Sequence, residues 1–442
     1  MPSKFRQIVL EITNDISNGK LKAGEKLLPL RTLAYQKGIS LGTASRVYDE
    51  LTAIGLTRGE IGRGTFVRHP VEHDYTDFAI QELPNEVIDF SRNYMILPTQ
   101  VDLFAQAVST VLKKQTDYLF YRENHGTNSD RYFASQFLSR SFSVSPEDTV
   151  ICSGGQHGIF MSLMASCRPG DAVAIEELSY PGLQLAAKQL RLELIPVRLD
   201  EDGLDAEHLE EICETHRVAA LYTMPNFQNP SSTIQSDVRR HQIARIARKF
   251  DITVIEDDAY GFLSDPAGLP LYALAPERTF HIRTFSKSWA PGLRICYLAC
   301  PEHKGSAMAQ LVRTTNWMAT PLMIDTAAEI IQSGMFDDIV RQKRIEVAWR
   351  HEKLAEMPLQ IRTVSGSLHA CISAISKIPD DQIVASLMAK GVKVSSMQQF
   401  AISSMAKTKK PEIRLCLGAP TQRMQFSQGL DAVESVLSHL QE

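Results

Sequence analysis

The segment HIRTFSKSWAPGLR, residues 281–294, contains the residues of this chain that are best suited to covalent chemistry. A lysine captures an aldehyde as a Schiff base when nearby cationic groups lower its pKa, and Lys287 is the candidate. Ser286 supplies a hydroxyl donor, and Arg294 supplies a guanidinium that grips oxygen atoms in pairs. The three residues together predict a lysine that binds an aldehyde carrying a phosphate group.

A second candidate phosphate element follows the predicted strand at 149–152. Gly154 and Gly155 let the backbone close around a phosphate, and Gln156 begins a predicted helix whose first N–H groups are aligned donors. Combined with Ser286 and Arg294, this turn predicts the second half of a phosphate site.

The segment around Lys287 resembles the cofactor lysine segment of fold-type I pyridoxal 5'-phosphate (PLP) aminotransferases. Four further stretches resemble the same family. They are Ser153–Gln156 (S-G-x-Q), Ser179–Gly182 (T-Y-P-G), Pro225–Pro230 (P-x-x-Q-N-P) and Asp257–Tyr260 (D-x-x-Y). The resemblance implies that PLP is the cofactor and that Lys287 holds it as an internal aldimine.

The resemblance also implies roles for single residues. Tyr180 stacks on the pyridine ring, Asp257 faces the ring nitrogen and keeps it protonated, and Asn229 and Tyr260 hold the 3'-oxygen. Tyr121 is expected to reach the phosphate in the partner subunit.

Arg414 matches the arginine that grips the α-carboxylate of an amino acid substrate. His369 is a candidate for lining the pocket.

Three positions depart from the pattern or carry special geometry. Ser231–Ser232 follows Pro230 where the family has Thr/Ser-Gly, and Cys296 stands where a glycine is usual after Arg294. We expect a shifted contact at Cys296, and the bond into Pro230 is a candidate for the cis form.

Apolar, β-rich runs alternate with helical patterns through the large domain. The runs are TVICSG, DAVAIEE, ELIPVRL, VAALYTM, ITVIEDD, FHIRTFS and YLACP. Strands separated by helix-length segments predict a largely parallel α/β sheet, which binds ligands at the carboxyl ends of its strands. The fold-type I resemblance adds a smaller C-terminal α+β subdomain.

The first 70 residues form a different module. Their patterns predict helices at 4–18, 29–37 and 40–54, followed by a β-hairpin around Gly59–Gly64. This order is typical of a winged helix-turn-helix. The second helix of the turn can enter a major groove of DNA, with Thr43, Ser45 and Arg46 in its first turns and Arg63 at the tip of the wing.

This module resembles the GntR family of bacterial regulators. SLGTASRVY and GRGTFV match its patterns, whereas LLPLR shifts the expected proline by one and loses a polar residue. The resemblance implies a double-stranded DNA operator as partner. The implied DNA-binding residues are Arg31, Ser40, Thr43, Ser45, Arg46 and Arg63. A protein-interaction module with solvated basic residues is the alternative.

Charge divides the chain in the same way. Residues 1–70 carry 11 Lys and Arg against 6 Asp and Glu, whereas the other 372 residues carry 36 against 45. The basic module is therefore the candidate for binding a polyanion. Seven scattered cysteines without a CxxC pair argue for reduced thiols and against a zinc site. No signal peptide or membrane span is expected, which predicts a cytoplasmic protein.

We therefore expect a winged helix-turn-helix at 1–70, a linker at 71–87 and an aminotransferase-like domain at 88–442. This combination is characteristic of the MocR subfamily of bacterial regulators. The resemblance implies a head-to-tail, domain-swapped homodimer in which an amino acid, an amine or PLP itself changes DNA binding through aldimine exchange at Lys287. Two alternatives stay open: a working aminotransferase with a DNA-binding module, and a PLP reservoir without an operator.

Overall fold

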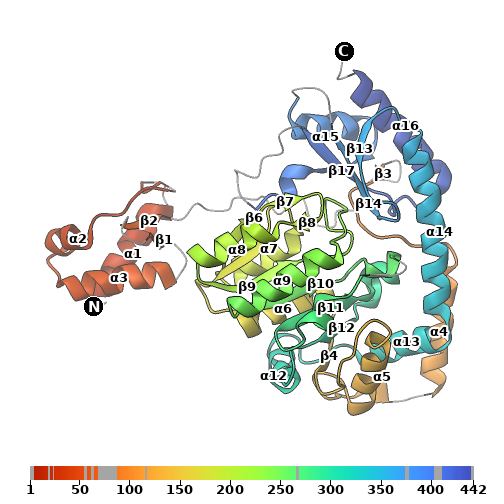
Figure 1. Cartoon of the computed structure of the whole chain (residues 1–442), viewed down its shortest axis with the longest axis horizontal. Helices are drawn as coiled ribbons and strands as arrows, with labels where there is room; N and C mark the ends of the chain where they lie inside the picture. The colour runs from red at the N-terminus through yellow and green to blue at the C-terminus, as the bar shows by residue number, and fades with distance from the viewer. Residues whose placement is uncertain are drawn as a thin grey trace.

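The computed structural model describes residues 4–17, 20–22, 24–53, 57–60, 64–67, 87–114, 117–264, 268–373, 378–402 and 411–439. Within these ranges the chain forms an N-terminal module and a larger part, each with a hydrophobic core of its own (Figure 1).

The N-terminal module contains three helices and a hairpin. They are α1 (Lys4–Ser17), α2 (Leu30–Lys37), α3 (Leu41–Ala53), β1 (Thr57–Glu60) and β2 (Gly64–Val67), with the two strands antiparallel. The predicted order is confirmed, although the expected helix ends at Gly19 and Gly55 lie outside the described residues. Gly38 ends α2 with φ +57°, a left-handed conformation that glycine adopts without steric cost.

The core of this module forms because each helix has apolar residues on one face. Ile8 and Ile12 of α1, Leu33 of α2, and Val47 and Leu51 of α3 are all buried together. Their spacing of three or four residues within a helix is the period that aligns side chains along one stripe.

All seven predicted apolar runs form strands of one sheet. Its order is β4 (Thr149–Cys152), β12 (Cys296–Ala299), β11 (Thr279–Thr284), β10 (Thr253–Asp257), β9 (Val218–Thr223), β5 (Ala172–Glu176) and β6 (Glu193–Val197). Strand β12 is antiparallel to both neighbours, and every other pair is parallel. The predicted largely parallel sheet is confirmed.

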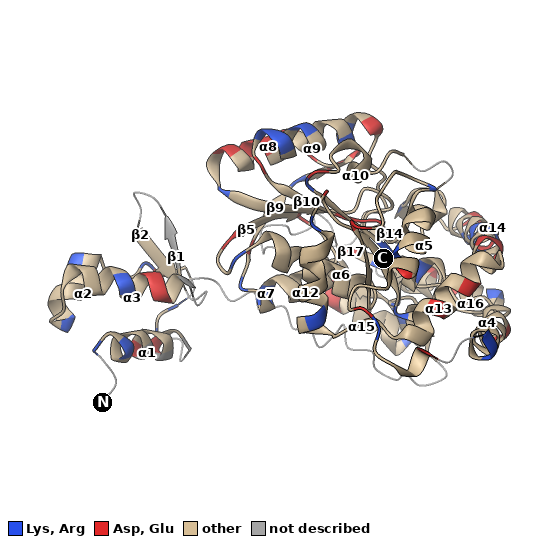
Figure 2. Ribbon diagram, turned by 90° about the horizontal axis from the view of Figure 1, so that it is seen from below, with Lys and Arg blue, Asp and Glu red and all other residues tan. Residues whose placement is uncertain are grey.

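Helices cover both faces of this sheet, as Figure 2 shows. The helices α6 (Gly155–Ser166), α7 (Pro181–Gln189) and α12 (Gly305–Thr315) lie on one face, and α8 (Ala206–Thr215), α9 (Asp237–Lys249) and α10 (Leu271–Leu274) lie on the other. Because both faces are covered, the central strands are apolar on both sides and read as continuous hydrophobic runs.

A smaller unit forms the C-terminal part. Its antiparallel sheet has the order β13 (Gln360–Arg362), β14 (His369–Ser373), β17 (Glu412–Cys416), β16 (Ser395–Ser396), and it packs against α15 (Asp380–Ala389) and α16 (Arg423–His439). The early strand β3 (Ile88–Asp89) pairs with β15 (Val392–Lys393), so the segment that follows the predicted linker belongs to this C-terminal unit.

The remaining elements connect these layers. They are α4 (Gln100–Lys114), η2 (Asp117–Leu119), α5 (Asn128–Leu138), β7 (Leu199–Asp200), β8 (Gly203–Leu204), η3 (Gly261–Leu263), α11 (Phe285–Ser288), η4 (Pro291–Leu293), α13 (Pro321–Gln332), α14 (Met335–Ala355) and η5 (Met397–Phe400). No helix in the described ranges has the length and apolar character needed to cross a membrane.

Candidate functional site

The predicted site residues converge at the carboxyl edge of the large sheet. Ser153 follows β4, Tyr180 follows β5, Asn229 lies in the loop after β9, Asp257 ends β10, and Lys287 lies in α11 directly after β11. Parallel strands end at one edge, so residues far apart in the sequence meet there.

Lys287 is half-buried, and a hydrogen bond fixes its amine. Its Nζ donates a hydrogen bond to the backbone oxygen of Asn93 at 2.6 Å. Burial lowers the pKa of Lys287 to about 8, and the positive charges of Arg414 and Arg294 lower it as well, while Asp257 opposes them. A pKa of about 8 leaves roughly one amine in ten unprotonated at pH 7, and the unprotonated amine is the form that attacks an aldehyde.

Asp257 provides a buried carboxylate opposite this amine. Burial raises its pKa to about 6, and a hydrogen bond from the Tyr222 hydroxyl to Oδ2, 2.7 Å long, opposes the rise. The group is therefore mainly ionised at pH 7. Sequence reasoning placed Asp257 here but gave no role to Tyr222, whose position in the middle of an apolar strand resembles that of a core residue.

Asn93 links two of the predicted residues and was not predicted. Its Nδ2 donates to the Tyr260 hydroxyl at 2.9 Å and to Nδ1 of His369 at 3.1 Å. Nε2 of His369 lies 2.9 Å from the backbone oxygen of Gln228, which only accepts, so the ring proton is on Nε2. Burial lowers the pKa of His369 to about 3, so the ring is neutral. The available signal for Asn93 was the polar run Ser91–Asn93 inside an otherwise apolar segment.

The glycine turn and Arg294 fit against each other. Gly154 has φ +87° and ψ 168°, and a Cβ there would lie 2.6 Å from Nη2 of Arg294. That nitrogen donates to the backbone oxygen of Ser153 at 3.0 Å. The amides of Gly155 and Gln156 are the first of α6, where N–H groups have no intrahelical acceptor.

Ser286 lies next to this turn. A Cβ at Gly155 would lie 3.2 Å from Cβ of Thr284, and the Thr284 hydroxyl donates to Oγ of Ser286 at 3.1 Å. The two halves predicted for a phosphate site, one after β4 and one after β11, are therefore neighbours.

Gln156 and Tyr180 meet above Gly182. Nε2 of Gln156 donates to the backbone oxygen of Gly182 at 2.6 Å, and a Cβ on Gly182 would lie 2.3 Å from both Oε1 of Gln156 and Cε1 of Tyr180. Only glycine fits beside the ring. Burial raises the pKa of Tyr180 to about 12, so its phenol keeps its proton.

Arg414 reaches the site from the C-terminal unit. Its Nη1 donates to Oδ1 of Asn229 at 2.7 Å, and its Nη2 donates to the backbone oxygen of Ser91 at 2.8 Å. The guanidinium also lies 4.4 Å from the centre of the Phe400 ring. Asn229 and Arg414, predicted for different groups of the ligand, are therefore in direct contact.

The loop after Asn229 contains residues that depart from the family pattern. The Asn229–Pro230 bond is cis, as considered from the sequence. Ser232, which stands where the family has glycine, adopts φ +68°, and its hydroxyl donates to the backbone oxygen of His369 at 2.8 Å. This hydrogen bond offsets part of the cost of a left-handed serine.

Three buried polar atoms of the site lack a hydrogen-bond partner in the described part of the chain. They are Oδ1 of Asn93, Oε1 of Gln156 and Nε of Arg414. Buried polar atoms are normally paired, so these three, with the open α6 amides, fit a polar ligand bound beside Lys287. No group of three or more His, Cys, Asp and Glu among the residues that the structure describes could hold a metal ion.

Tyr121 is not among the residues that meet at Lys287. Its side chain is 80% exposed, and its ring packs against Trp317 at 5.6 Å. The neighbours Leu119 and Phe120 are also exposed.

The predicted DNA-binding residues lie on α2, α3 and the turn between them. Arg31 is exposed on α2, and Oγ of Ser40 caps α3 by accepting from the amide of Thr43 at 3.1 Å. The Ser45 hydroxyl lies 3.5 Å from Asp49, and the Arg46 guanidinium lies over the Phe5 ring. Arg63 lies outside the described residues.

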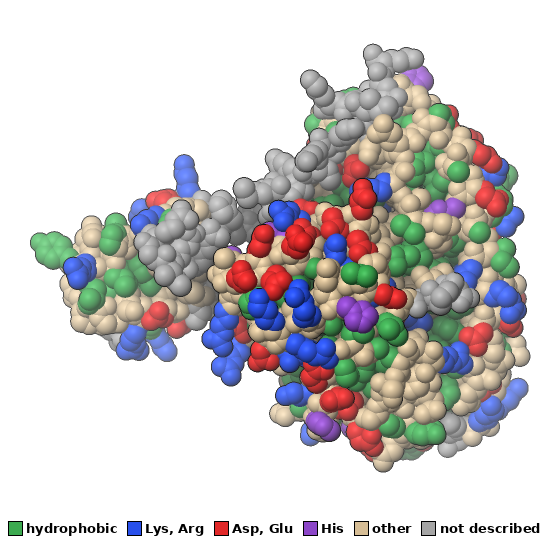
Figure 3. Space-filling model, in the orientation of Figure 1, with side chains coloured by type: hydrophobic (Ala, Val, Ile, Leu, Met, Phe, Trp, Pro, Cys, Tyr) green, Lys and Arg blue, Asp and Glu red, His purple; other side chains and the backbone are tan. Residues whose placement is uncertain are grey.

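The surface formed by α8 and α9 carries charged side chains of both signs. Figure 3 shows acidic and basic side chains interspersed there, and they form ion pairs such as Lys249 with Glu210 at 2.8 Å and Arg248 with Glu277 at 2.9 Å. This face therefore has little net charge to attract DNA.

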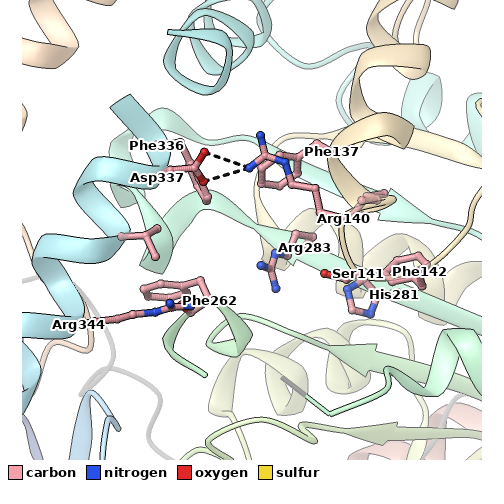
Figure 4. A pocket seen from close by; sticks show the side chains of 12 residues that line it. Phe137, Arg140, Ser141, Phe142, Phe262, His281, Arg283, Phe336, Asp337 and Arg344 are labelled. Atoms are coloured by element: carbon pink, nitrogen blue, oxygen red, sulfur yellow. Dashed lines mark hydrogen bonds and ion pairs between the residues drawn. The ribbon is translucent and has the colours of Figure 1, made fainter. Parts of the chain in front are cut away.

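A cavity of about 170 Å³ lies between α5, β11 and α14 (Figure 4). Phe137, Phe262 and Phe336 line it together with Arg283 and the ion pair between Arg140 and Asp337, which is 3.0 Å long. None of its lining residues is among those that meet at Lys287, so the cavity is separate from that site.

We expect Gly154→Ala to destabilise the protein by about 2–4 kcal/mol, because its φ and ψ suit only glycine and a Cβ displaces Arg294. Urea unfolding measures the change. In an Arg294→Ala background the Cβ of residue 154 no longer clashes with the guanidinium. The same substitution should then lower the free energy of unfolding by about 1 kcal/mol less. Equal costs in both backgrounds would show that Arg294 does not press on this turn.

We expect Asp257→Asn to stabilise the protein without cofactor by about 1–3 kcal/mol at pH 7. In the folded protein the pKa of Asp257 is about 6, above its ordinary value of 3.8. The folded state therefore favours the protonated carboxyl, and the stability that this gives below pH 4 is lost as the pH rises through 6. The free energy of unfolding, measured from pH 4 to pH 8, should be higher in Asp257→Asn than in wild type only at the upper end of this range. The surface variant Asp431→Asn is the control, and a gain independent of pH would contradict the assignment.

Two family models match the chain. Residues 85–433 match "Aminotransferase class I and II", and residues 4–67 match "Bacterial regulatory proteins, gntR family". The resemblances stated from the sequence are thereby confirmed.

Curated relatives align with this chain along most of their length. The HTH-type transcriptional regulator YdeF of Bacillus subtilis is 26% identical over 455 residues, covering 99% of this chain and 95% of the relative. The HTH-type pyridoxine biosynthesis transcriptional regulator PdxR of Corynebacterium glutamicum is 26% identical, covering 89% and 88%.

Solved aminotransferases share the fold of the larger part. The α-aminoadipate aminotransferase LysN of Thermus thermophilus has a TM-score of 0.73 at 20% identity, covering 81% of this chain and 93% of that one. The kynurenine aminotransferase of Pyrococcus horikoshii has a TM-score of 0.73 at 21% identity, covering 83% and 97%. The chain therefore belongs to the class I and II aminotransferase family and, with its gntR-family module, to the MocR subfamily of GntR transcriptional regulators.

Proposed function

We propose that this transcriptional regulator binds PLP at Lys287 and that an amino acid, an amine or PLP itself changes DNA binding through that site. The observation that carries the proposal is the half-buried Lys287 amine, whose pKa is lowered and which lies at the same sheet edge as Asp257 and the α6 amides. PLP supplies an aldehyde for the lysine, a phosphate, and a ring that withdraws electrons.

Each residue of the site has a part in this proposal. The α6 amides of Gly155 and Gln156, with Ser286 and Arg294, hold the phosphate. Tyr180 covers one face of the ring, and ionised Asp257 pairs with the ring nitrogen. The side chains of Asn229 and Tyr260 hold the 3'-oxygen. They contact Arg414 and Asn93, so a ligand that replaces these contacts would reorient them.

Arg414 is the candidate for sensing an effector carboxylate. Its hydrogen-bond partners are the Asn229 side-chain amide, a backbone oxygen and the Ser395 hydroxyl, all neutral, so a carboxylate would be the stronger partner. An amino acid whose amino group takes the cofactor aldehyde from Lys287 would then be bound by Arg414 through its carboxylate. The name of the Corynebacterium relative, a regulator of pyridoxine biosynthesis, supports PLP itself as the other candidate signal.

The N-terminal module binds a double-stranded operator in this proposal. Arg31, Ser40, Thr43, Ser45 and Arg46 lie on the helix-turn-helix, and Arg63 belongs to the wing. A head-to-tail dimer is supported by the exposed cluster of Leu119, Phe120, Tyr121 and Trp317, because exposed aromatic groups of this size favour a protein interface. Tyr121 would then reach the phosphate bound in the partner. Such a regulator acts in the bacterial cytoplasm.

Adding PLP to the cofactor-free protein should give a visible absorption band in wild type and in Lys304→Ala, but not in Lys287→Ala. A band that shifts with one amino compound and then stays identifies the effector. Absence of the band in wild type would overturn the assignment of Lys287.

DNA selected from a random duplex library by the full chain should bind with an affinity that falls steeply with salt, because lysine and arginine contacts release counterions. Arg31→Ala should weaken binding about tenfold and reduce the salt slope. Lys353→Ala, on α14, is the control. Recovery of no enriched sequence would contradict an operator-binding role.

A second candidate, a working aminotransferase, is favoured by the completeness of the site. The aromatic-amino-acid aminotransferase 1 of Thermococcus litoralis is 28% identical over 214 residues, 46% of this chain. Lys287 could then move a proton as the general base. If an amino donor bleaches the visible absorption band of the PLP-bound protein and a 2-oxo acid restores it, the protein is an active aminotransferase.

A further inference from the structure

A second lysine is buried directly behind Lys287. Lys343 lies in the middle of α14 and is 0% exposed, and its Nζ donates to the backbone oxygens of Lys287 at 3.1 Å and Trp289 at 2.7 Å. The Trp289 oxygen also accepts from Nε2 of Gln100 at 2.8 Å. Neither the sequence patterns nor the proposed function assigns a role to Lys343.

The acceptors of Lys343 are carbonyl groups at the end of α11. This helix has four residues, and Trp289 is its C-cap. The last carbonyls of a helix have no intrahelical donor, and lysine side chains are among the groups that satisfy them. Lys343 therefore fixes the backbone of the turn that carries Lys287, including the carbonyl of Lys287 itself.

A lysine is a costly way to fill this position. A buried ammonium group needs an anion, and no carboxylate in the described ranges lies within ion-pair distance of Lys343, whose two partners are neutral carbonyls. Burial lowers the pKa of Lys343 to about 7, and the positive charge of Lys287 lowers it too. A methionine would fill a similar volume without a charge, so stability alone does not account for the lysine.

Helix α14 belongs to both parts of the aminotransferase-like domain. Phe336 and Ile339 pack in the core of the large sheet, whereas Leu354 packs in the core of the C-terminal unit. Arg350, two turns after Lys343, donates to the backbone oxygens of Leu417 and Pro420 in that unit. One continuous helix therefore joins the C-terminal unit to Lys343.

We propose that Lys343 is a positioning residue for Lys287, through which α14 couples the C-terminal unit to the turn that carries the amine. Arg414 lies on β17 of the same unit, so a carboxylate that draws Arg414 moves α14 and, through Lys343, the Lys287 backbone. This coupling rests on the proposed function of Lys287 and adds the path by which an effector reaches it.

The test compares Lys343→Met with Lys353→Met, which removes a half-buried lysine from the same helix. For each variant, thermal unfolding of the cofactor-free protein gives stability, and titration with PLP followed by absorption gives affinity. We expect Lys343→Met to raise the unfolding temperature or leave it unchanged, and to weaken PLP binding about tenfold or more because the turn loses two hydrogen bonds. Lys353→Met should match wild type in both.

The two measurements separate the possible outcomes. Unchanged PLP affinity in Lys343→Met overturns the proposal, and so does a loss of affinity that accompanies a lower unfolding temperature, because the lysine then only supports the fold. Stability kept or raised with affinity lost supports positioning. Failure of wild type itself to bind PLP would refute the proposed function instead, and it is recognised in the wild-type titration alone.

Discussion

Burial of the Lys287 amine is the interaction on which the rest of the site depends. An amine taken out of water has a lowered pKa unless an anion lies nearby. At Lys287 the carboxylate of Asp257 raises the pKa, whereas Arg294 and Arg414 lower it, and a second lysine lies close by. The sheet makes this possible because five strand ends meet at one edge and helices exclude water from both faces. A reactive lysine is therefore a consequence of architecture as much as of residue type.

The site also joins two units. Lys287, Asp257 and the glycine turn come from the large sheet, whereas Arg414 and His369 come from the sheet of the C-terminal unit. Hydrogen bonds from Arg414 to Asn229 and from His369 to the backbone oxygen of Gln228 cross between them. A ligand that replaces either contact changes how the units fit, which is the kind of differential contact that a conformational response requires. The basic N-terminal module has its own core and so can keep its fold during such a response.

Much of this could be predicted from the sequence for physical reasons. Seven apolar runs formed the seven strands because a sheet covered on both faces leaves long hydrophobic segments, and the helices of the N-terminal module followed their apolar stripes. The antiparallel direction of β12 has no such signal, since direction depends on the path of the chain between strands. Contacts made through the backbone were also missed: the backbone oxygen of Asn93 accepts from Lys287, and Lys343 donates to two backbone oxygens. Every residue type supplies a backbone oxygen, so the sequence gives no signal for these contacts. The pairing of β3 with the C-terminal unit depends on long-range contacts that periodicity does not encode.

The most direct test of the account measures the affinity of the full chain for its selected DNA with and without PLP, in wild type and in Lys287→Ala. Coupling between two sites is reciprocal, so PLP should change the DNA dissociation constant of wild type by about 5–150-fold, and DNA should change PLP affinity by the same factor. Lys287→Ala should bind DNA with one affinity under both conditions. The account would be contradicted if the DNA affinity of wild type stayed the same with PLP alone and with PLP plus the amino compound that shifts its absorption band. A response of Lys287→Ala equal to that of wild type would also contradict it.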